Sequence, residues 1–303
     1  MRSTLRTSRR ALVLGGLAAG ALAPVVRAAD TPHRPTPSRV VAMDFGLAET
    51  LIEMGRPPIA VPDPDTWADW VVEPPLPSGI VNLGTDREPN LELLAALKPD
   101  LIVTTPFLEA VFPLLARFAP TLTFSIYAPP AGRVYARSVA ATRDLAAAMG
   151  LEDAGAALIA RAQATMDATR ARLAPHAGRP LLVVQFLDTR HVRVFGPGGL
   201  FGDVLERCGL VNGWTRPSNF WGFSTVGIEA LAESPQSSLI YLEPISPDTL
   251  EKLNASPLWN SLPFVKAGRI HRLPPALMFG MLPSAMRFAR ELTRALDGAP
   301  SHG

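Results

Sequence analysis

Residues 151–173 read LEDAGAALIARAQATMDATRARL, a stretch without proline that is rich in Ala, Arg and Leu. These residues are among the best helix formers. Gly150 before the stretch and Pro175 after it predict where one continuous helix begins and ends. At 1.5 Å per residue the helix is about 33 Å long, which is enough to connect two lobes. A helical pair packed on one sheet is the alternative.

On both sides of this helix, short β-rich runs alternate with helical patterns. Before it, strands are expected at 39–43, 59–61, 80–83, 101–105 and 121–124, and helices at 47–54, 91–97 and 107–118. After it, a hairpin is expected at 181–187 and 191–195, helices at 200–208, 227–232, 247–253 and 284–296, and strands at 239–242 and 269–273. Such alternation is typical of parallel α/β sheets. We predict two Rossmann-like α/β lobes joined by a single long α-helix, with a ligand cleft between the lobes.

The predicted organisation has five parts. Residues 1–28 form an export signal, 29–38 a Pro-rich leader, 39–150 the N-terminal lobe, 151–174 the linking helix and 175–303 the C-terminal lobe. The signal is of the twin-arginine type, because Arg9 and Arg10 precede an apolar run and a small-residue cleavage site. That run, Ala11 to Val26, is shorter than the roughly 20 residues of a spanning helix. We expect a soluble periplasmic protein, with an uncleaved membrane anchor as the alternative.

Charge and side-chain chemistry exclude several classes of function. The chain has 29 basic and 27 acidic residues, but the signal removes only basic ones, so the mature chain is slightly acidic. An acidic chain disfavours nucleic-acid binding. The histidines lack the spacing of metal ligands, and we expect no metal bound directly by side chains; they are His33, His176, His191, His271 and His302.

Two segments approach known enzyme motifs and depart from them. Residues 196–202 (GPGGLFG) resemble a dinucleotide fingerprint, but the third glycine is one place late. Residues 222–226 (GFSTV) begin like a nucleophile elbow but lack the final glycine. The sequence therefore predicts no enzyme.

Six segments together resemble periplasmic ferric-hydroxamate siderophore-binding proteins, which belong to the long-helix class of ABC-importer substrate-binding proteins. They are 70–77 (WVVEPPLP), 88–94 (EPNLELL), 219–222 (NFWG), 257–259 (PLW), 263–269 (PFVKAGR) and 283–288 (PSAMRF). The resemblance implies a monomer that captures a ferric siderophore and delivers it to the membrane permease subunits of an ABC importer. Iron then arrives only as the siderophore chelate, and no other cofactor is expected.

The resemblance also implies which residues bind the ligand. Trp70 and Trp221, one from each lobe, are expected to line the cleft. The other expected ligand-binding residues are Arg87, Phe107, Leu108, Arg193, Asn219, Leu277, Met278 and Phe279. Asp86 stands where the family has an arginine, so Arg87 takes that role only after a one-residue shift, and Arg193 replaces a leucine. The cleft is therefore expected to be less aromatic and more cationic than in the family, and to suit a mixed-ligand or carboxylate-bearing siderophore.

Two acidic residues are expected to dock the protein on its permease. The resemblance implies Glu229 on the second lobe and, near the corresponding first-lobe position, Glu109. Two alternatives to a siderophore carrier stay open. One is a haem- or cobalamin-binding protein of the same class, in which haem would need an axial tyrosine or histidine. The other is an exported oxidoreductase or hydrolase, which would need a reactive group of side chains.

Overall fold

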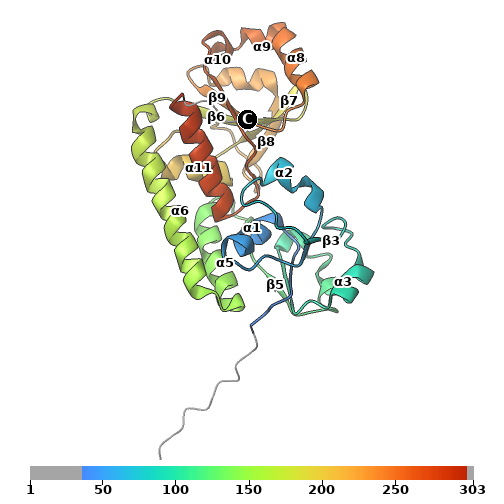
Figure 1. Cartoon of the computed structure of the whole chain (residues 1–303). Coiled ribbons are helices and arrows are strands. Elements are labelled where there is room, and N and C mark those ends of the chain that lie inside the picture. The colour runs from blue at the N-terminus through green and yellow to red at the C-terminus, as the bar shows by residue number, and fades with distance from the viewer. Residues whose placement is uncertain (1–35, 299–303) are drawn as a thin grey trace, which may run out of the picture. The chain divides into compact units, whose positions relative to one another are not determined.

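A computed structural model describes residues 36–298 of the chain (Figure 1). The predicted signal at 1–28, with Arg9 and Arg10, and most of the leader at 29–38 lie outside the described residues. Within 36–298, no helix combines the length and the apolar character that crossing a membrane requires.

The first lobe is built on a five-stranded sheet in which every pair of neighbours is parallel. Its strands are β1 (Val40–Ala42), β2 (Ala60–Val61), β3 (Val81–Asn82), β4 (Leu101–Thr104) and β5 (Thr121–Thr123), in the order β3-β2-β1-β4-β5. Because the strands are parallel, their carboxyl ends lie along one edge of the sheet.

Helices and 3₁₀ turns connect these strands. The helices are α1 (Phe45–Glu53), α2 (Trp67–Trp70), α3 (Leu91–Leu97) and α4 (Phe112–Leu115), and the 3₁₀ turns are η1 (Pro64–Thr66) and η2 (Pro106–Leu108). Asp44 caps α1 and Asn90 caps α3, each by accepting a hydrogen bond from a backbone N–H of the first helical turn. The strand–helix alternation predicted from the sequence is confirmed.

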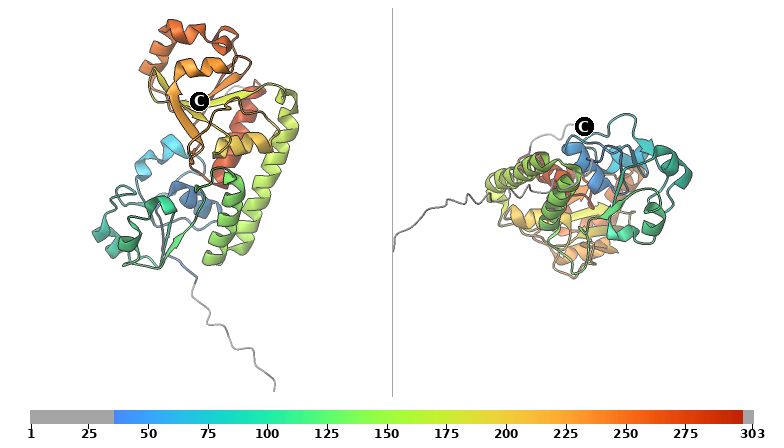
Figure 2. Two further views of the ribbon diagram at one scale, coloured as in Figure 1. Left: turned by 180° about the vertical axis from the view of Figure 1, so that it is seen from behind. Right: turned by 90° about the horizontal axis from the view of Figure 1, so that it is seen from below.

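Two long helices follow the first lobe. They are α5 (Val134–Met149) and α6 (Glu152–Leu173), separated by Gly150 in the left-handed conformation. The predicted long helix is therefore confirmed as one continuous element of 22 residues. The terminal helix α11 (Leu282–Leu296) packs along α6, and both lie side by side in two views (Figures 1 and 2).

The second lobe has a mixed five-stranded sheet in the order β10-β9-β6-β7-β8. Its strands are β6 (Leu181–Phe186), β7 (His191–Phe195), β8 (Phe223–Gly227), β9 (Ser238–Leu242) and β10 (Ile270–Leu273). Strands β10, β9 and β6 are parallel, whereas β7 is antiparallel to both β6 and β8. The helices are α7 (Leu200–Arg207), α8 (Pro247–Ala255), α9 (Pro257–Ser261) and α10 (Pro263–Lys266), and the short turns are η3 (Ala174–His176) and η4 (Ile228–Glu233). The predicted β6–β7 hairpin is confirmed.

Two predicted helices are wrong. The helix expected at 107–118 is replaced by η2 and the short α4, because Pro106 and Pro113 lack the backbone N–H that a helix interior needs and fit only the first turn of a helix. The helix expected at 227–232 is a 3₁₀ turn, and residues 223–227 form the edge strand β8. Pairing with β7 supplies the backbone hydrogen bonds of residues 223–227.

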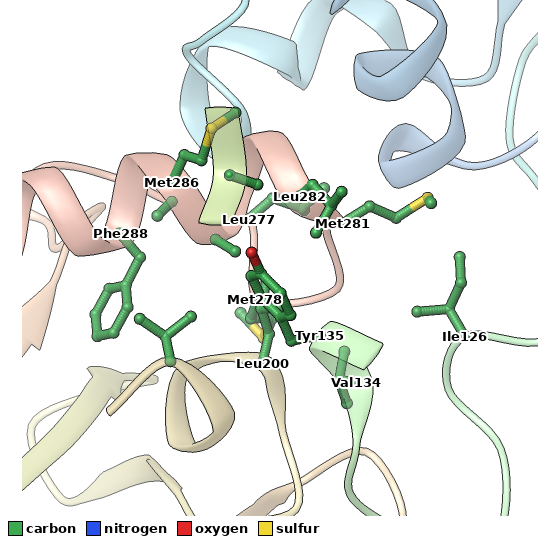
Figure 3. Close-up of a cluster of buried hydrophobic side chains, with 14 of the residues drawn as sticks. Ile126, Val134, Tyr135, Leu200, Leu277, Met278, Met281, Leu282, Met286 and Phe288 are labelled. Carbon is green, nitrogen blue, oxygen red and sulfur yellow. The ribbon is translucent and has the colours of Figure 1, made fainter. Parts of the chain in front are cut away.

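The two lobes share a hydrophobic core near α11. Ile126 and Val134, from before and within α5, belong to the same buried cluster as Leu200, Met281 and Phe288 (Figure 3). The segment 277–281, which connects β10 to α11, runs through this cluster. The segment 277–281 is therefore packed against buried side chains of both lobes.

Candidate functional site

Residues of both lobes line one cavity of about 290 Å³. The first lobe contributes Met43, Asp44, Phe45, Pro62, Asp63, Thr66, Trp70 and Asp86, and the second contributes Arg193, Leu277, Met278 and Phe279. Small-molecule sites in proteins usually occupy roughly 300–1,000 Å³ and favour boundaries between lobes. This cavity is at the lower end of that range and is the candidate ligand site.

Three carboxylates stand on the first-lobe wall of the cavity. Asp44, Asp63 and Asp86 come after β1, β2 and β3, three neighbouring strands, so the parallel sheet brings their strand ends to one edge. Asp44 is half-buried and accepts a hydrogen bond from the backbone N–H of Leu47 at 3.0 Å. Burial raises the pKa of Asp44 to about 6, although hydrogen bonds from the backbone of Leu47 and Gly46 oppose the shift.

Trp70, at the end of α2, is held in place by the residues around it. Trp67, one turn earlier, is buried and donates a hydrogen bond from Nε1 to the carbonyl of Pro74 at 2.9 Å. Glu73 forms ion pairs with Arg287 at 3.0 Å and with Arg290 at 2.6 Å, both on α11. These ion pairs connect the segment after Trp70 to α11, the helix that follows the cavity residues 277–279.

Arg193, in the middle of β7, is the basic residue of the cavity lining. Its guanidinium lies 5.2 Å from the ring centroid of Phe223, and Nη1 donates to Gln185 Oε1 at 3.4 Å. These contacts come from the two strands that flank β7. Neighbouring strands therefore fix the orientation of the cation at the cavity.

An aromatic cluster adjoins the cavity and joins the two lobes. We define it as Phe107, Tyr127, Trp221 and Phe279. The ring centroid of Trp221 lies 5.0 Å from that of Phe107, 5.9 Å from that of Tyr127 and 5.2 Å from that of Phe279. Phe107 follows β4 and Tyr127 follows β5, so the first-lobe rings come from the opposite half of the sheet edge from the carboxylates. Phe279 belongs to both the cluster and the cavity lining.

A tight turn presents Trp221 to this cluster. The side chain of Asn219 accepts hydrogen bonds from the backbone N–H of Trp221 at 3.0 Å and of Phe223 at 3.2 Å. Gly222 has a φ of 84°, and a Cβ at this position would lie 2.0 Å from the backbone nitrogen of Gly199. The turn therefore requires glycine, and Asn219 shapes it rather than lining the cavity.

Two first-lobe side chains hold the segment 277–281. Tyr127 donates its hydroxyl to the carbonyls of Met278 at 3.0 Å and Gly280 at 2.9 Å. Glu49, fully buried in α1, accepts from the backbone N–H of Met281 at 2.8 Å and from the Ser284 hydroxyl at 2.6 Å. Burial raises the pKa of Glu49 to about 8, against these hydrogen bonds, which lower it. Glu49 thus caps α11 across the lobe boundary.

The structure separates the ligand-binding residues predicted from the sequence into three sets. Trp70, Arg193, Leu277, Met278 and Phe279 line the cavity, and Phe107 and Trp221 lie in the adjoining aromatic cluster. The remaining three, Arg87, Leu108 and Asn219, do not line the cavity.

Asn219 shapes the turn described above, and the other two residues lie elsewhere in the first lobe. Arg87 is exposed, and its guanidinium lies 4.7 Å from the ring centroid of Phe107. Leu108 is only 2% exposed and packs in the first-lobe core with Ile102 and Leu115. Arg193, the cation expected from the sequence, does line the cavity, but three aspartates line it as well.

Asp44, Asp63, Glu49 and the role of Tyr127 were not predicted from the sequence. The two aspartates had a usable signal, because each comes at or just after the end of a predicted strand and strand ends gather at one edge. Glu49 is an acidic residue in a mostly apolar helix, which is a weaker indication of a special role. Within the described part of the chain, no group of three or more His, Cys, Asp or Glu residues could hold a metal ion.

The two expected docking residues are both exposed. Glu109 follows η2 on the first lobe, and Glu229 lies in the first turn of η4 on the second.

Comparisons with known proteins agree with this architecture. A family model described as periplasmic binding protein matches residues 40–277. The iron(3+)-hydroxamate-binding protein FhuD of Escherichia coli (strain K12) is 34% identical over 293 residues, which cover 96% of this chain and 97% of that protein. The Fe(3+)-citrate-binding protein YfmC of Bacillus subtilis (strain 168) is 23% identical over 239 residues, covering 78% of this chain and 73% of that protein.

Solved structures show the same fold. The crystal structure of the siderophore-binding protein FhuD from Vibrio cholerae, bound to Fe3+-Desferal, matches with a TM-score of 0.80 and 28% identity. The match covers 86% of this chain and 97% of that chain. The predicted fold class, two α/β lobes with a long connecting helix, is confirmed.

Proposed function

Because this chain belongs to the periplasmic binding protein family, we propose that it captures a ferric siderophore of the hydroxamate type and delivers it to an inner-membrane ABC importer. The twin-arginine signal with Arg9 and Arg10 exports it to the periplasm, where it works as a soluble monomer. It carries its ligand without transforming it, and iron is bound only as the chelate.

The charge of the cavity lining is the observation that supports a hydroxamate siderophore as the ligand. A ferric tris-hydroxamate is electrically neutral, whereas ferric catecholate and ferric citrate chelates are anions. A wall with Asp44, Asp63 and Asp86 repels an anionic chelate more than a neutral one. Carboxylate-bearing siderophores, which the sequence suggested, therefore fit this lining less well.

The apolar lining suits the flanks of such a chelate. Trp70, Phe45 and Phe279 offer rigid apolar surface that buries large area at little cost in side-chain entropy. The siderophore supplies the oxygen ligands of the iron, and Arg193 donates hydrogen bonds to those oxygens from outside. The protein then contacts the outer surface of the chelate and never the ion.

Delivery to the permease uses a different surface. Glu109 and Glu229 are exposed on different lobes and pair with arginines of the membrane subunits. Exposed ion pairs contribute about 0–1 kcal/mol each, which suits reversible docking. Glu109→Gln and Glu229→Gln should slow uptake in cells while the affinity of the purified protein for its ligand stays unchanged.

Intrinsic tryptophan fluorescence tests the ligand assignment. The mature protein is titrated with a neutral ferric trihydroxamate, ferric citrate, haem and cobalamin, with the iron-free siderophore as control. We expect saturable quenching by the ferric trihydroxamate, weaker binding of ferric citrate and no saturable response to haem or cobalamin. Tighter binding of haem or cobalamin, or chemical change in the recovered ligand, would favour the alternative functions.

A further inference from the structure

The cavity has walls of opposite charge. Asp44, Asp63 and Asp86 stand on the first-lobe wall, and among residues 36–298 none of them forms an ion pair with a basic side chain. The three do not form a group that could hold a metal ion. Their charges are therefore spread along the wall, which suits an extended organic ligand better than a bare cation.

The second-lobe wall supplies the opposite charge. Arg193 lines the same cavity and, within the described chain, also has no carboxylate partner. Gln185, Phe223 and Met278 hold its guanidinium. Both walls thus carry charges without an ion-pair partner that line one cavity. Asp63 is exposed, whereas Asp44, Asp86 and Arg193 are half-buried.

We propose that the ferric siderophore binds in one orientation, with its iron-chelating oxygens toward Arg193 and a positively charged ammonium arm toward Asp63 and Asp86. This inference rests on the proposed function and adds the ligand class: a hydroxamate siderophore with a free amine. Chelating oxygens are electron-rich and attract the guanidinium donors. An ammonium group donates three hydrogen bonds and offsets part of the negative charge of the first-lobe wall.

The orientation follows from where the charged side chains of the cavity lie. Asp86 lines the first-lobe wall, whereas the neighbouring Arg87 is exposed and does not line the cavity. The cation of the cavity instead comes from β7 of the opposite lobe. The electron-rich face of the ligand is therefore drawn to the second lobe in this protein.

A matched pair of ligands tests the proposal. The affinity of the mature protein is measured for ferrioxamine B, which has a free terminal amine, and for its N-acetylated form, which has the same chelate and no charge on that arm. We expect the free amine to bind about 10-fold more tightly at low ionic strength, with the preference shrinking as salt is added. The double variant Asp63→Asn with Asp86→Asn should lose the preference, so that the two ligands bind this variant with equal affinity.

Asparagine is the suitable replacement at both positions. Asp63 has a φ of 45°, a left-handed conformation that asparagine also tolerates. Asp44 is left unchanged because its carboxylate caps α1. Arg193→Leu should weaken the binding of both ligands by a similar factor, since both share the chelate. As a control for folding, the melting temperature of every variant is compared with that of the parent.

The outcomes separate this proposal from the proposed function. Equal affinity for the two ligands, or a preference that survives the double variant, overturns the ammonium contact while the siderophore-binding function stands. An Arg193→Leu variant that binds both ligands as well as the parent overturns the orientation. Failure of every ferric hydroxamate to bind overturns the proposed function itself.

Discussion

The carboxylates of the first-lobe wall lie at one half of a sheet edge, and the first-lobe rings of the aromatic cluster lie at the other half. We call these the acidic half and the aromatic half, and they face different parts of the molecule. The carboxylates follow β3, β2 and β1 and border an open cavity, whereas Phe107 and Tyr127 follow β4 and β5 and contact Trp221 of the other lobe. The aromatic half thus contacts the other lobe directly, whereas the acidic half borders the candidate ligand cavity. Strand order in a parallel sheet decides which half a residue joins.

Both halves depend on the segment 277–281, and the largest expected effect is on its anchor. Glu49→Ala leaves the donors of Met281 and Ser284 without their buried acceptor. We expect the free energy of unfolding to fall by about 2–4 kcal/mol, measured by urea denaturation. Glu49→Gln, which keeps one acceptor oxygen, should recover part of the loss. Equal stability of all three proteins would contradict the role of Glu49.

The same anchor predicts how stability depends on pH. The pKa of Glu49 is raised to about 8 and that of Asp44 to about 6, so between about pH 4.5 and 8 the folded protein holds more protons than the unfolded chain. The free energy of unfolding should therefore fall as pH rises through this window. Each group contributes a slope of up to about 1.4 kcal/mol per pH unit, Asp44 only up to about pH 6 and Glu49 up to about pH 8. Melting curves across the window should show a shallower fall for Glu49→Gln. A parent protein that gains stability with rising pH there would contradict the assignment.

Trp221→Ala tests whether the aromatic half also binds ligand. The substitution removes contacts with Phe107, Tyr127 and Phe279. We expect the affinity for a ferric trihydroxamate to fall about 10- to 100-fold, the size expected for loss of a buried aromatic contact surface. Isothermal titration calorimetry suits this variant because it does not depend on tryptophan emission. Trp221→Phe is the control, and unchanged affinity in the alanine variant would confine the ligand to the acidic half.

Tyr127→Phe separates the ring of Tyr127 from its hydroxyl. The ring contacts with Trp221 and Phe279 stay, and the hydrogen bonds to the carbonyls of Met278 and Gly280 are lost. A typical hydrogen bond contributes about 1 kcal/mol, so we expect the affinity to fall about 5-fold. Ser138→Ala, which removes a buried hydroxyl within α5, is the matched control and should leave affinity unchanged.

Arg87→Ala should have the smallest effect. The guanidinium is exposed, does not line the cavity and contacts the ring of Phe107 from outside. An exposed cation–π contact contributes about 0.5–1 kcal/mol, so ligand affinity should change by less than about 3-fold. A loss of 10-fold or more would place Arg87 in the site and weaken the case for Arg193.

Much of the fold could be predicted because its signals are local. The long helix is encoded by helix-forming residues between Gly150 and Pro175, and the hairpin of β6 and β7 by two β-rich runs around a short turn. Strand β8 at 223–227 was not predicted, because its pairing partner β7 lies elsewhere in the chain. The site was predictable only where the resemblance named a residue, as for Trp70 and Arg193.

By itself the sequence determined the two lobes, the linking helix and the family, because propensity, periodicity and motif order are properties of neighbouring residues. The tertiary structure alone decided that Asp44, Asp63 and Asp86 share a wall, that Arg193 faces the same cavity and that Glu49 caps α11. Glu49 and Met281 are 232 positions apart, and no local pattern encodes a contact over such a distance. Strand order and lobe packing create that contact, and with it the chemistry of the cavity.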